Sequence, residues 1–151
     1  MASLSKFGAV TLTALSVLTG TLVSLSKPAV AGEVVLDDRC RPNQKLQSDG
    51  AFVNYQSAFT ANRQSYWFSA ARYLDGAVLL CISKPNFREA KPLSVSQLQN
   101  QFIHKIVKAP NSNAVFLVTV AEGNGGPVPL TDYRLNLSNP NKPVLTRLRQ
   151  R

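Results

Sequence analysis

The sequence predicts an α+β fold, in which a small twisted antiparallel sheet of five to six strands carries one helix, at about residues 95–107, on one face. Two apolar runs joined by Asp75-Gly76 predict a β-hairpin. Apolar residues recur at helical spacing in residues 95–107, and several other short segments alternate between apolar and polar residues. A β-sandwich with a helical crossover is the alternative.

Residues 1–31 are expected to form a cleaved secretory signal peptide. Lys6 precedes an apolar run, and Ala29-Val30-Ala31 gives the A-x-A pattern of a cleavage site. The alternative is an uncleaved membrane anchor, because the run can be extended to Leu25, about the length that spans a bilayer. Cleavage is favoured since threonines and serines dilute the run. We therefore expect a secreted or periplasmic protein without a stable membrane span after cleavage.

Residues 32–151 are expected to form a single globular domain, because a chain of this length suits one hydrophobic core. Cys40 and Cys81 are the two cysteines, and in an exported chain they most simply form one disulfide. The sequence has no C-x-x-C pair and a single histidine, so a metal-binding or reactive thiol is not supported.

The segment before the hairpin is expected to hold two strands separated by turns. Residues 33–38 predict a short first strand, and residues 44–50 are polar and end in a turn signal. Residues 51–59 alternate between apolar and polar side chains, as in a half-buried antiparallel strand.

Residues 64–84 predict the hairpin itself, with a two-residue loop at Asp75-Gly76. Such a loop places Ala71 opposite Leu80. Residues 77–82 are apolar on both faces, which predicts a strand in the middle of a sheet. Alternation collects one apolar face, which consists of Trp67, Ala71, Tyr73, Val78, Leu80 and Ile82.

Residues 95–107 predict the helix. Ser94 and Gln97 match a capping box, and Pro110 ends the segment. This helix is expected to cover the apolar face of the hairpin. Its apolar positions are Val95, Leu98, Phe102, Ile103 and Ile106.

The remaining residues predict three strands. Residues 114–121 are apolar on both faces and are expected beside residues 77–82. Residues 131–137 alternate, with their tyrosine and leucines facing inward. Residues 144–149 are expected to form the last strand.

Charge is the feature with the clearest functional meaning. The chain carries 17 basic and 8 acidic residues, a formal net charge of +9. Removal of residues 1–31, which include Lys6 and Lys27, leaves 15 − 8 = +7. This excess favours adsorption to polyanions.

The candidate anion-binding residues are Arg134, Arg147, Arg149 and Arg151. Alternation along the last strand predicts that Arg147, Arg149 and Arg151 share one face, where guanidinium groups can bind phosphate, sulfate or uronate groups in a bidentate manner. The simpler interpretation is a charged edge strand that prevents edge-to-edge aggregation.

A candidate binding loop consists of Gly123, Asn124, Gly125 and Gly126. It follows a predicted strand, but Pro127 comes next instead of a lysine and a helix N-terminus. The loop therefore does not match a phosphate-binding loop.

No catalytic residue and no metal site is predicted. His104 is the single histidine, it is expected near the polar side of the helix, and no G-x-S-x-G pattern accompanies it. The acidic cluster of Glu33 and Asp37-Asp38 lacks the spacing of a calcium loop. We therefore expect no cofactor and no enzymatic activity.

Together these features predict a small exported binding or structural protein. Its basic surface is expected to associate with an anionic envelope or extracellular polymer, or with a protein partner. The alternative is a small secreted enzyme inhibitor that presents residues 123–129 to a cleft. No nucleic-acid partner is expected, because the aromatic residues that would stack bases are needed for the core.

Overall fold

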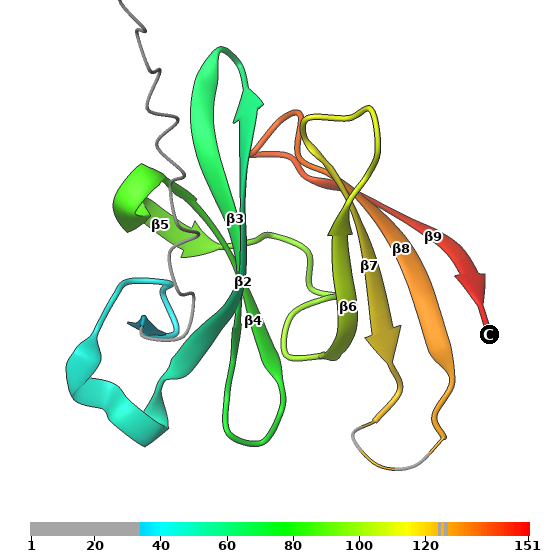
Figure 1. Ribbon diagram of the computed structural model, residues 1–151, viewed down its shortest axis with the longest axis horizontal. Coiled ribbons are helices and arrows are strands. Elements are labelled where there is room, and N and C mark those ends of the chain that lie inside the picture. Colours follow the sequence, from blue (N-terminus) through cyan, green and yellow to red (C-terminus); the bar gives the residue numbers. More distant parts are fainter. Residues whose placement is uncertain (1–33, 124, 126) are drawn as a thin grey trace, which may run out of the picture.

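Two antiparallel sheets make up the fold (Figure 1). The computed structural model describes residues 34–123, 125 and 127–151. Sheet A contains, in spatial order, β1 (Val35–Leu36), β2 (Ala51–Ala61), β3 (Gln64–Arg72), β4 (Val78–Lys84) and β5 (Arg88–Pro92). Sheet B contains β6 (Phe102–Lys108), β7 (Val115–Ala121), β8 (Leu130–Asn136) and β9 (Val144–Gln150). Two short 3₁₀ helices, η1 (Gln44–Asp49) and η2 (Pro85–Phe87), lie in connections of sheet A.

The two sheets pack face to face around an apolar core. Phe68 of β3 and Phe59 of β2 both contact Phe116 of β7, with ring centroids 4.7 Å and 6.0 Å apart. Because these contacts cross from one sheet to the other, the architecture is a two-layer β-sandwich. Other buried side chains of this layer are Leu80, Ile82, Leu98, Val118, Leu135 and Leu137.

The expected α+β fold is wrong, because residues 95–107 do not form a helix. Turns at residues 96–100 lead directly into β6. Among the described residues, no helix reaches seven residues. Of the alternative fold, the two sheets are present, whereas the helical crossover is absent. The chain passes between the sheets through the irregular segment 93–101.

A β-bulge explains why β6 resembles a helix in sequence. Ile103 lies opposite Val120 and Ile106 lies opposite Val118, so β6 holds one residue more than β7 in this interval. Both isoleucines therefore face the core although they are three positions apart. Residues three positions apart also share the face of a helix, so the apolar pattern fits both structures.

The crossover is attached to sheet A by a side chain instead of a capped helix. The Gln99 amide donates to the carbonyl oxygens of Leu80 (2.8 Å) and Leu93 (2.9 Å). Its oxygen accepts from the N–H group of Leu80 (2.9 Å). The side chain thus forms hydrogen bonds with the N–H and the carbonyl of Leu80 in β4, as the backbone of a neighbouring strand would. Ser94 and Gln97, the expected capping box, are exposed and lie outside any helix.

The β3–β4 hairpin is present, but its register differs by one residue from the expected one. Ala70 lies opposite Leu80, where a two-residue loop would place Ala71. The loop holds three residues, 74–76, because the flanking residues bond to each other. Gly76 ends this loop with a φ of +94°, a conformation that glycine adopts without a steric penalty.

This shift reverses the two faces of β3. Phe68 faces the core between the sheets, and Trp67 faces the other side, where its ring centroid lies 5.6 Å from that of Phe87. The expected face that joins Trp67 with Leu80 is therefore wrong. β4 lies between β3 and β5 and is buried at residues 78–83, as its two apolar faces predict. β7 lies in the middle of sheet B, whereas it was expected beside β4.

The N-terminal segment covers part of the outer face of sheet A. The predicted disulfide between Cys40 and Cys81 is present, and both cysteines are buried. Leu36 and Cys40 pack with Val53 and Leu79 in a second apolar cluster. The disulfide therefore fixes this segment to β4.

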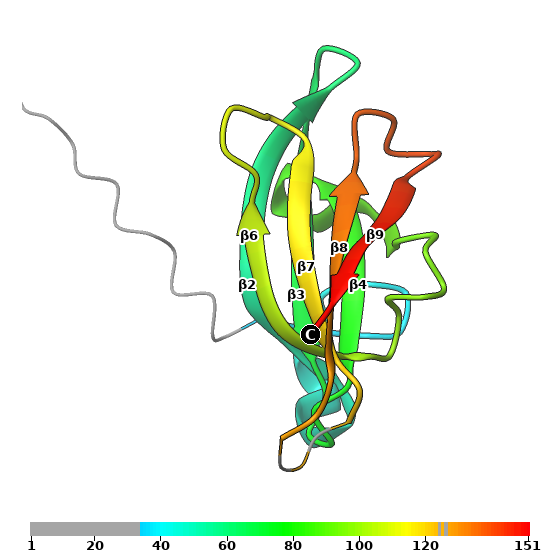
Figure 2. The ribbon, with the colours of Figure 1, turned by 90° about the vertical axis from the view of Figure 1, so that its right-hand side faces the viewer.

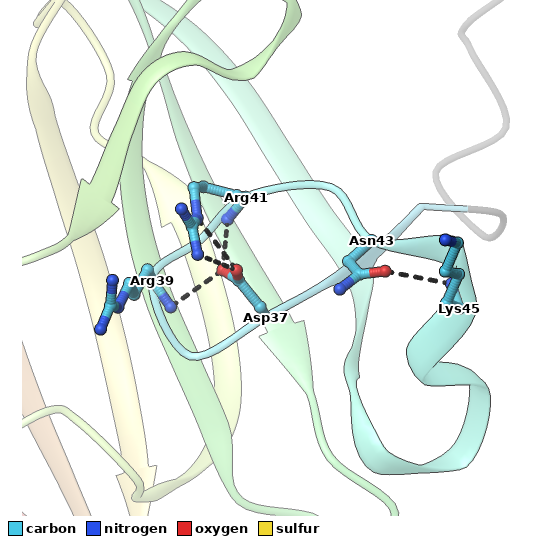
Figure 3. Close-up of polar contacts among 5 residues, drawn as sticks. All are labelled: Asp37, Arg39, Arg41, Asn43 and Lys45. Carbon is cyan, nitrogen blue, oxygen red and sulfur yellow. Dashed lines mark hydrogen bonds and ion pairs between the residues drawn. The ribbon is translucent and has the colours of Figure 1, made fainter.

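Asp37 organises the turn that follows β1 (Figure 3). Its carboxylate accepts from the N–H groups of Arg39 (3.0 Å) and Arg41 (2.8 Å) and from Arg41 Nε (3.0 Å). Burial raises the pKa of Asp37, but the hydrogen bonds from Arg41 and Arg39 outweigh it, so the pKa lies below its ordinary value of 3.8. Asn43 Oδ1 accepts from the N–H of Lys45 (3.2 Å) and begins η1. Asp37, one residue of the acidic cluster, therefore stabilises the turn after β1.

Candidate binding face

One face of sheet B turns away from the core, and no described element lies over it (Figure 2). The register identifies its side chains, since directly opposed residues of neighbouring strands share a face. One row across all four strands consists of Lys105, Thr119, Asp132 and Arg149. The next row consists of Val107, Leu117, Arg134 and Thr146. We call this surface, together with Leu148 and Arg151, the basic face.

An open pocket of about 400 Å³ lies on the basic face. The aliphatic side chains of Val107, Leu117 and Leu148 line it together with Lys105 and Arg149. Val107 is 37% exposed and Leu148 is 51% exposed. The pocket therefore presents apolar surface directly beside positive charge.

Asp132 connects the basic residues of this face. Its carboxylate accepts from Arg149 Nε (2.7 Å) and from Thr119 Oγ1 (2.7 Å), and Arg151 Nε lies 3.4 Å away. The hydrogen bonds from Arg149 and Thr119 lower the pKa of Asp132 to about 2. The Asp132 side chain is 14% exposed, whereas those of Arg149 and Arg151 are 67% and 52% exposed. Both arginines are thus oriented by one carboxylate and remain accessible to a partner.

The four candidate arginines do not all lie on this face. A bulge between β8 and β9 places Arg147 opposite Tyr133 and Arg149 opposite Asp132. Adjacent residues of β8 point to opposite faces, so Arg147 and Arg149 do so as well. Arg147 instead donates to Gln150 Oε1 (2.7 Å). The expectation that Arg147, Arg149 and Arg151 share one face is therefore wrong for Arg147, while Arg134 joins the other two.

The basic face carries a net positive charge. Lys105, Arg134, Arg149 and Arg151 are basic, and Asp132 is acidic, which gives 4 − 1 = +3 for the face as defined. Sequence reasoning missed Lys105, Thr119 and Asp132. The outward position of Asp132 follows from the alternation in β8, but its neighbours depend on strand order, which no local pattern reports.

The candidate binding loop connects β7 to β8. The N–H of Glu122 bonds to the carbonyl oxygen of Pro129 (3.1 Å) and closes the base of the loop. Gly123 has a φ of +135°. Asn124 and Gly126 lie outside the described residues, and the binding role of residues 123–126 stays a prediction.

His104 and the acidic cluster, for which no catalytic or metal-binding role was predicted, lie on different parts of the fold. His104 is the extra residue of the bulge in β6 and is exposed, not on a helix as expected. Asp37 and Asp38 belong to the turn over sheet A, and Glu33 lies outside the described residues. In residues 34–123, 125 and 127–151, no group of three or more histidine, cysteine, aspartate or glutamate side chains is placed to hold a metal ion. The absence of enzymatic activity stays a prediction.

Comparisons of the chain with protein-family models, curated proteins and solved structures gave no match. In the described part of the chain, no helix is long and apolar enough to cross a membrane. The expected signal peptide, residues 1–31, lies outside the described residues.

Proposed function

We propose that this protein is an exported binding protein that holds an acidic partner protein on the basic face. The observation that supports the proposal is the row across sheet B in which Asp132 orients Arg149 beside an open pocket. A compact domain normally covers an apolar sheet face, as the N-terminal segment does on sheet A. An uncovered face with aliphatic and basic residues is suited to a partner of opposite charge.

The arginines are prepared for binding by their contacts with Asp132. A flexible arginine loses side-chain entropy when a partner immobilises it, and an arginine that is already oriented loses less. The Nε–H group of Arg149 donates to Asp132, and most of the Arg149 side chain is exposed to solvent. Its remaining N–H groups can therefore donate to a carboxylate of the partner.

The aliphatic residues favour a protein over a linear anionic polymer. Val107, Leu117 and Leu148 line the pocket together with the basic residues, and a polyuronate chain has no alkyl or aromatic side groups to cover them. Protein interfaces combine an apolar centre with arginines and a polar rim. We therefore expect the partner to present carboxylates next to apolar side chains.

Export is supported by the disulfide. The bond between Cys40 and Cys81 is compatible with an oxidising compartment such as the periplasm or the extracellular space. The expected signal peptide at residues 1–31 points in the same direction.

A pair of matched variants tests the binding face. Arg134→Ser removes an arginine from the basic face, and Arg147→Ser removes one from the other side of the neighbouring strand. Both residues are exposed and both variants change the net charge equally. The probe is a fluorescent peptide of glutamate and leucine residues, and its affinity is measured by anisotropy at low and at physiological salt, beside labelled polygalacturonate.

We expect Arg134→Ser to weaken peptide binding about fivefold, because a charge pair at a solvent-accessible interface contributes about 1 kcal/mol. Arg147→Ser should change the affinity less than about twofold, through net charge alone. Equal losses for the two variants would contradict the basic face as the binding site. Tighter binding of polygalacturonate than of the peptide would exclude a protein as the preferred partner and favour an anionic polymer.

A further inference from the structure

A second cleft lies beside β6, between this strand and the tip of the β3–β4 hairpin, which points to the lower end of Figure 1. Its volume is about 580 Å³. Arg72, Ile103 and His104 line this cleft and also line a smaller cavity of about 180 Å³ that reaches β2. The two spaces therefore adjoin, and we call them together the Arg72 cleft.

Two β-bulges shape the smaller cavity. Asn54 is the extra residue of the bulge in β2, and His104 is the extra residue of the bulge in β6. Both residues line the cavity, although they belong to different sheets. Bulges interrupt the regular ladder and redirect side chains, and they are frequent beside functional sites. The bulges thus bring an amide and an imidazole to the same opening between the sheets.

Arg72 provides a guanidinium group with unused donors. One of its terminal nitrogens donates to the carbonyl oxygen of Ile103, at 3.3 Å. A guanidinium has five N–H donors, so this bond leaves most of them available. Among the described residues, no carboxylate forms an ion pair with Arg72. Carboxylate and phosphate are the small anions whose geometry matches the remaining pairs of donors.

The larger part of the cleft offers apolar side chains beside its polar ones. Leu74, Phe102 and Ala121 line it, and Leu74 is 74% exposed at the hairpin tip. Asp75 lies in the same lining and repels additional negative charge. A ligand with a single negative charge on an apolar body therefore fits this cleft better than a dianion such as phosphate.

We infer that the Arg72 cleft binds a monocarboxylate carried on an aliphatic or aromatic body. Arg72 holds the carboxylate, His104 lies beside it as a second donor, and the body of the ligand packs against Phe102 and Leu74. Lys105 of the basic face also lines the smaller cavity of this cleft, whereas Arg72, Leu74, Phe102 and His104 do not belong to the basic face. The inference adds a small-molecule ligand to the proposed partner protein and does not depend on that proposal.

The test is a titration of the ¹⁵N-labelled protein with hexanoate, followed by amide shifts in NMR spectra. We expect saturable shifts at Arg72, Leu74, Phe102 and His104. Hexanoate should bind at least about tenfold more tightly than acetate, because each fully buried methylene group contributes about 0.8 kcal/mol, or about fourfold in affinity. The neutral alcohol 1-hexanol should bind about tenfold more weakly than hexanoate, because it cannot form a charge-assisted pair with Arg72. Inorganic phosphate should also bind more weakly than hexanoate.

A matched arginine variant locates the carboxylate. Arg72→Gln should weaken hexanoate binding at least about tenfold. Arg88→Gln is the control, because Arg88 also donates to a backbone carbonyl at 3.3 Å but lies on β5, away from the cleft. A third variant, Leu74→Ser, keeps the contact between Arg72 and Ile103 and should reduce the preference for hexanoate over acetate.

Three results would overturn the inference. They are unsaturable shifts spread over the basic residues of both sheets, equal effects of the Arg72 and Arg88 variants, and tighter binding of phosphate than of hexanoate. The acidic peptide that probes the basic face should bind Arg72→Gln about as well as the unmodified protein. Failure of either site therefore leaves the other one testable.

Discussion

The replacement Asp132→Asn tests the electrostatic centre of the basic face. Asparagine keeps the shape of the side chain and an oxygen that can accept from Thr119, but it removes the negative charge beside Arg149 and Arg151. The pKa of Asp132 lies at about 2, against an ordinary value of 3.8. That difference corresponds to about 2 kcal/mol of preference for the charged form in the folded state. Because the two arginines are 67% and 52% exposed, solvent and salt screen the interaction, and we expect a loss of about 1 kcal/mol.

The loss of stability in Asp132→Asn should depend on pH in a defined direction. The pKa of Asp132 is lower in the folded state than in the unfolded state, so the charged form contributes stability above about pH 4. This contribution is lost as the pH falls from about 4 towards 2, where the folded protein also becomes protonated at Asp132. The difference between the unmodified protein and the variant should therefore be constant from pH 7 to pH 5 and shrink below pH 4.

Urea denaturation at pH 7, 5, 3 and 2.5 measures this difference as a free energy of unfolding. The control is Asp38→Asn, which changes an exposed aspartate and should alter stability by less than about 0.5 kcal/mol at each pH. A loss in Asp132→Asn that stays the same at pH 7 and pH 2.5 would refute the ion-pair explanation. A loss below about 0.3 kcal/mol at pH 7 would show that Asp132 does not hold the arginines.

Three further predictions concern the fold. Replacing Cys40 and Cys81 with serine should lower the free energy of unfolding by about 4 kcal/mol, measured by urea denaturation, because the bond closes a loop with a sequence separation of 41 residues. Gly76→Ala should lower the thermal midpoint by several degrees and the stability by about 1 kcal/mol, since alanine is strained at a φ of +94°. Gln99→Ala should cost about 2 kcal/mol, because it leaves the buried N–H of Leu80 in β4 without a partner, whereas the Leu80 carbonyl keeps its bond from the Leu93 N–H. Gln97→Ala is the control for Gln99→Ala, and both are measured by chemical denaturation. A large loss of stability in Gln97→Ala would favour a capped helix over the observed turn.

Most strands could be predicted from the sequence because their side chains follow the period of a strand. The apolar segment 114–121 corresponds to β7 (Val115–Ala121), and segment 144–149 corresponds to β9 (Val144–Gln150). Their assignment to two sheets could not be predicted, because strand order depends on contacts between residues far apart in sequence. The helix at residues 95–107 was wrong for a local reason, since one bulge residue gives Ile103 and Ile106 a helical spacing.

Loop length was the second source of error. Asp75-Gly76 favours a positive φ at glycine, and this requirement is met by the observed three-residue loop as well as by the expected two-residue loop. A two-residue hairpin loop with two consecutive positive φ angles is formed instead by Asn62 (48°) and Arg63 (60°), between β2 and β3. Arginine is not typical of such a turn, so composition gave no signal there.

The candidate site was only partly predictable for the same reason. The sequence identifies Arg134, Arg149 and Arg151 as basic residues on predicted strands, and the structure brings them to one face. The bulge at Leu148 separates Arg147 from them. Asp132 was missed because its importance arises from hydrogen bonds across β7, β8 and β9.

The most direct measurement of the proposed function is a map of the amide shifts that an acidic, leucine-containing peptide causes in NMR spectra of the ¹⁵N-labelled protein. If the basic face binds the partner, the largest changes occur at Thr119, Arg134 and Leu148 and decrease at high salt. If the largest changes instead fall on the outer face of sheet A or on the loop at residues 122–129, the basic face is not the binding site.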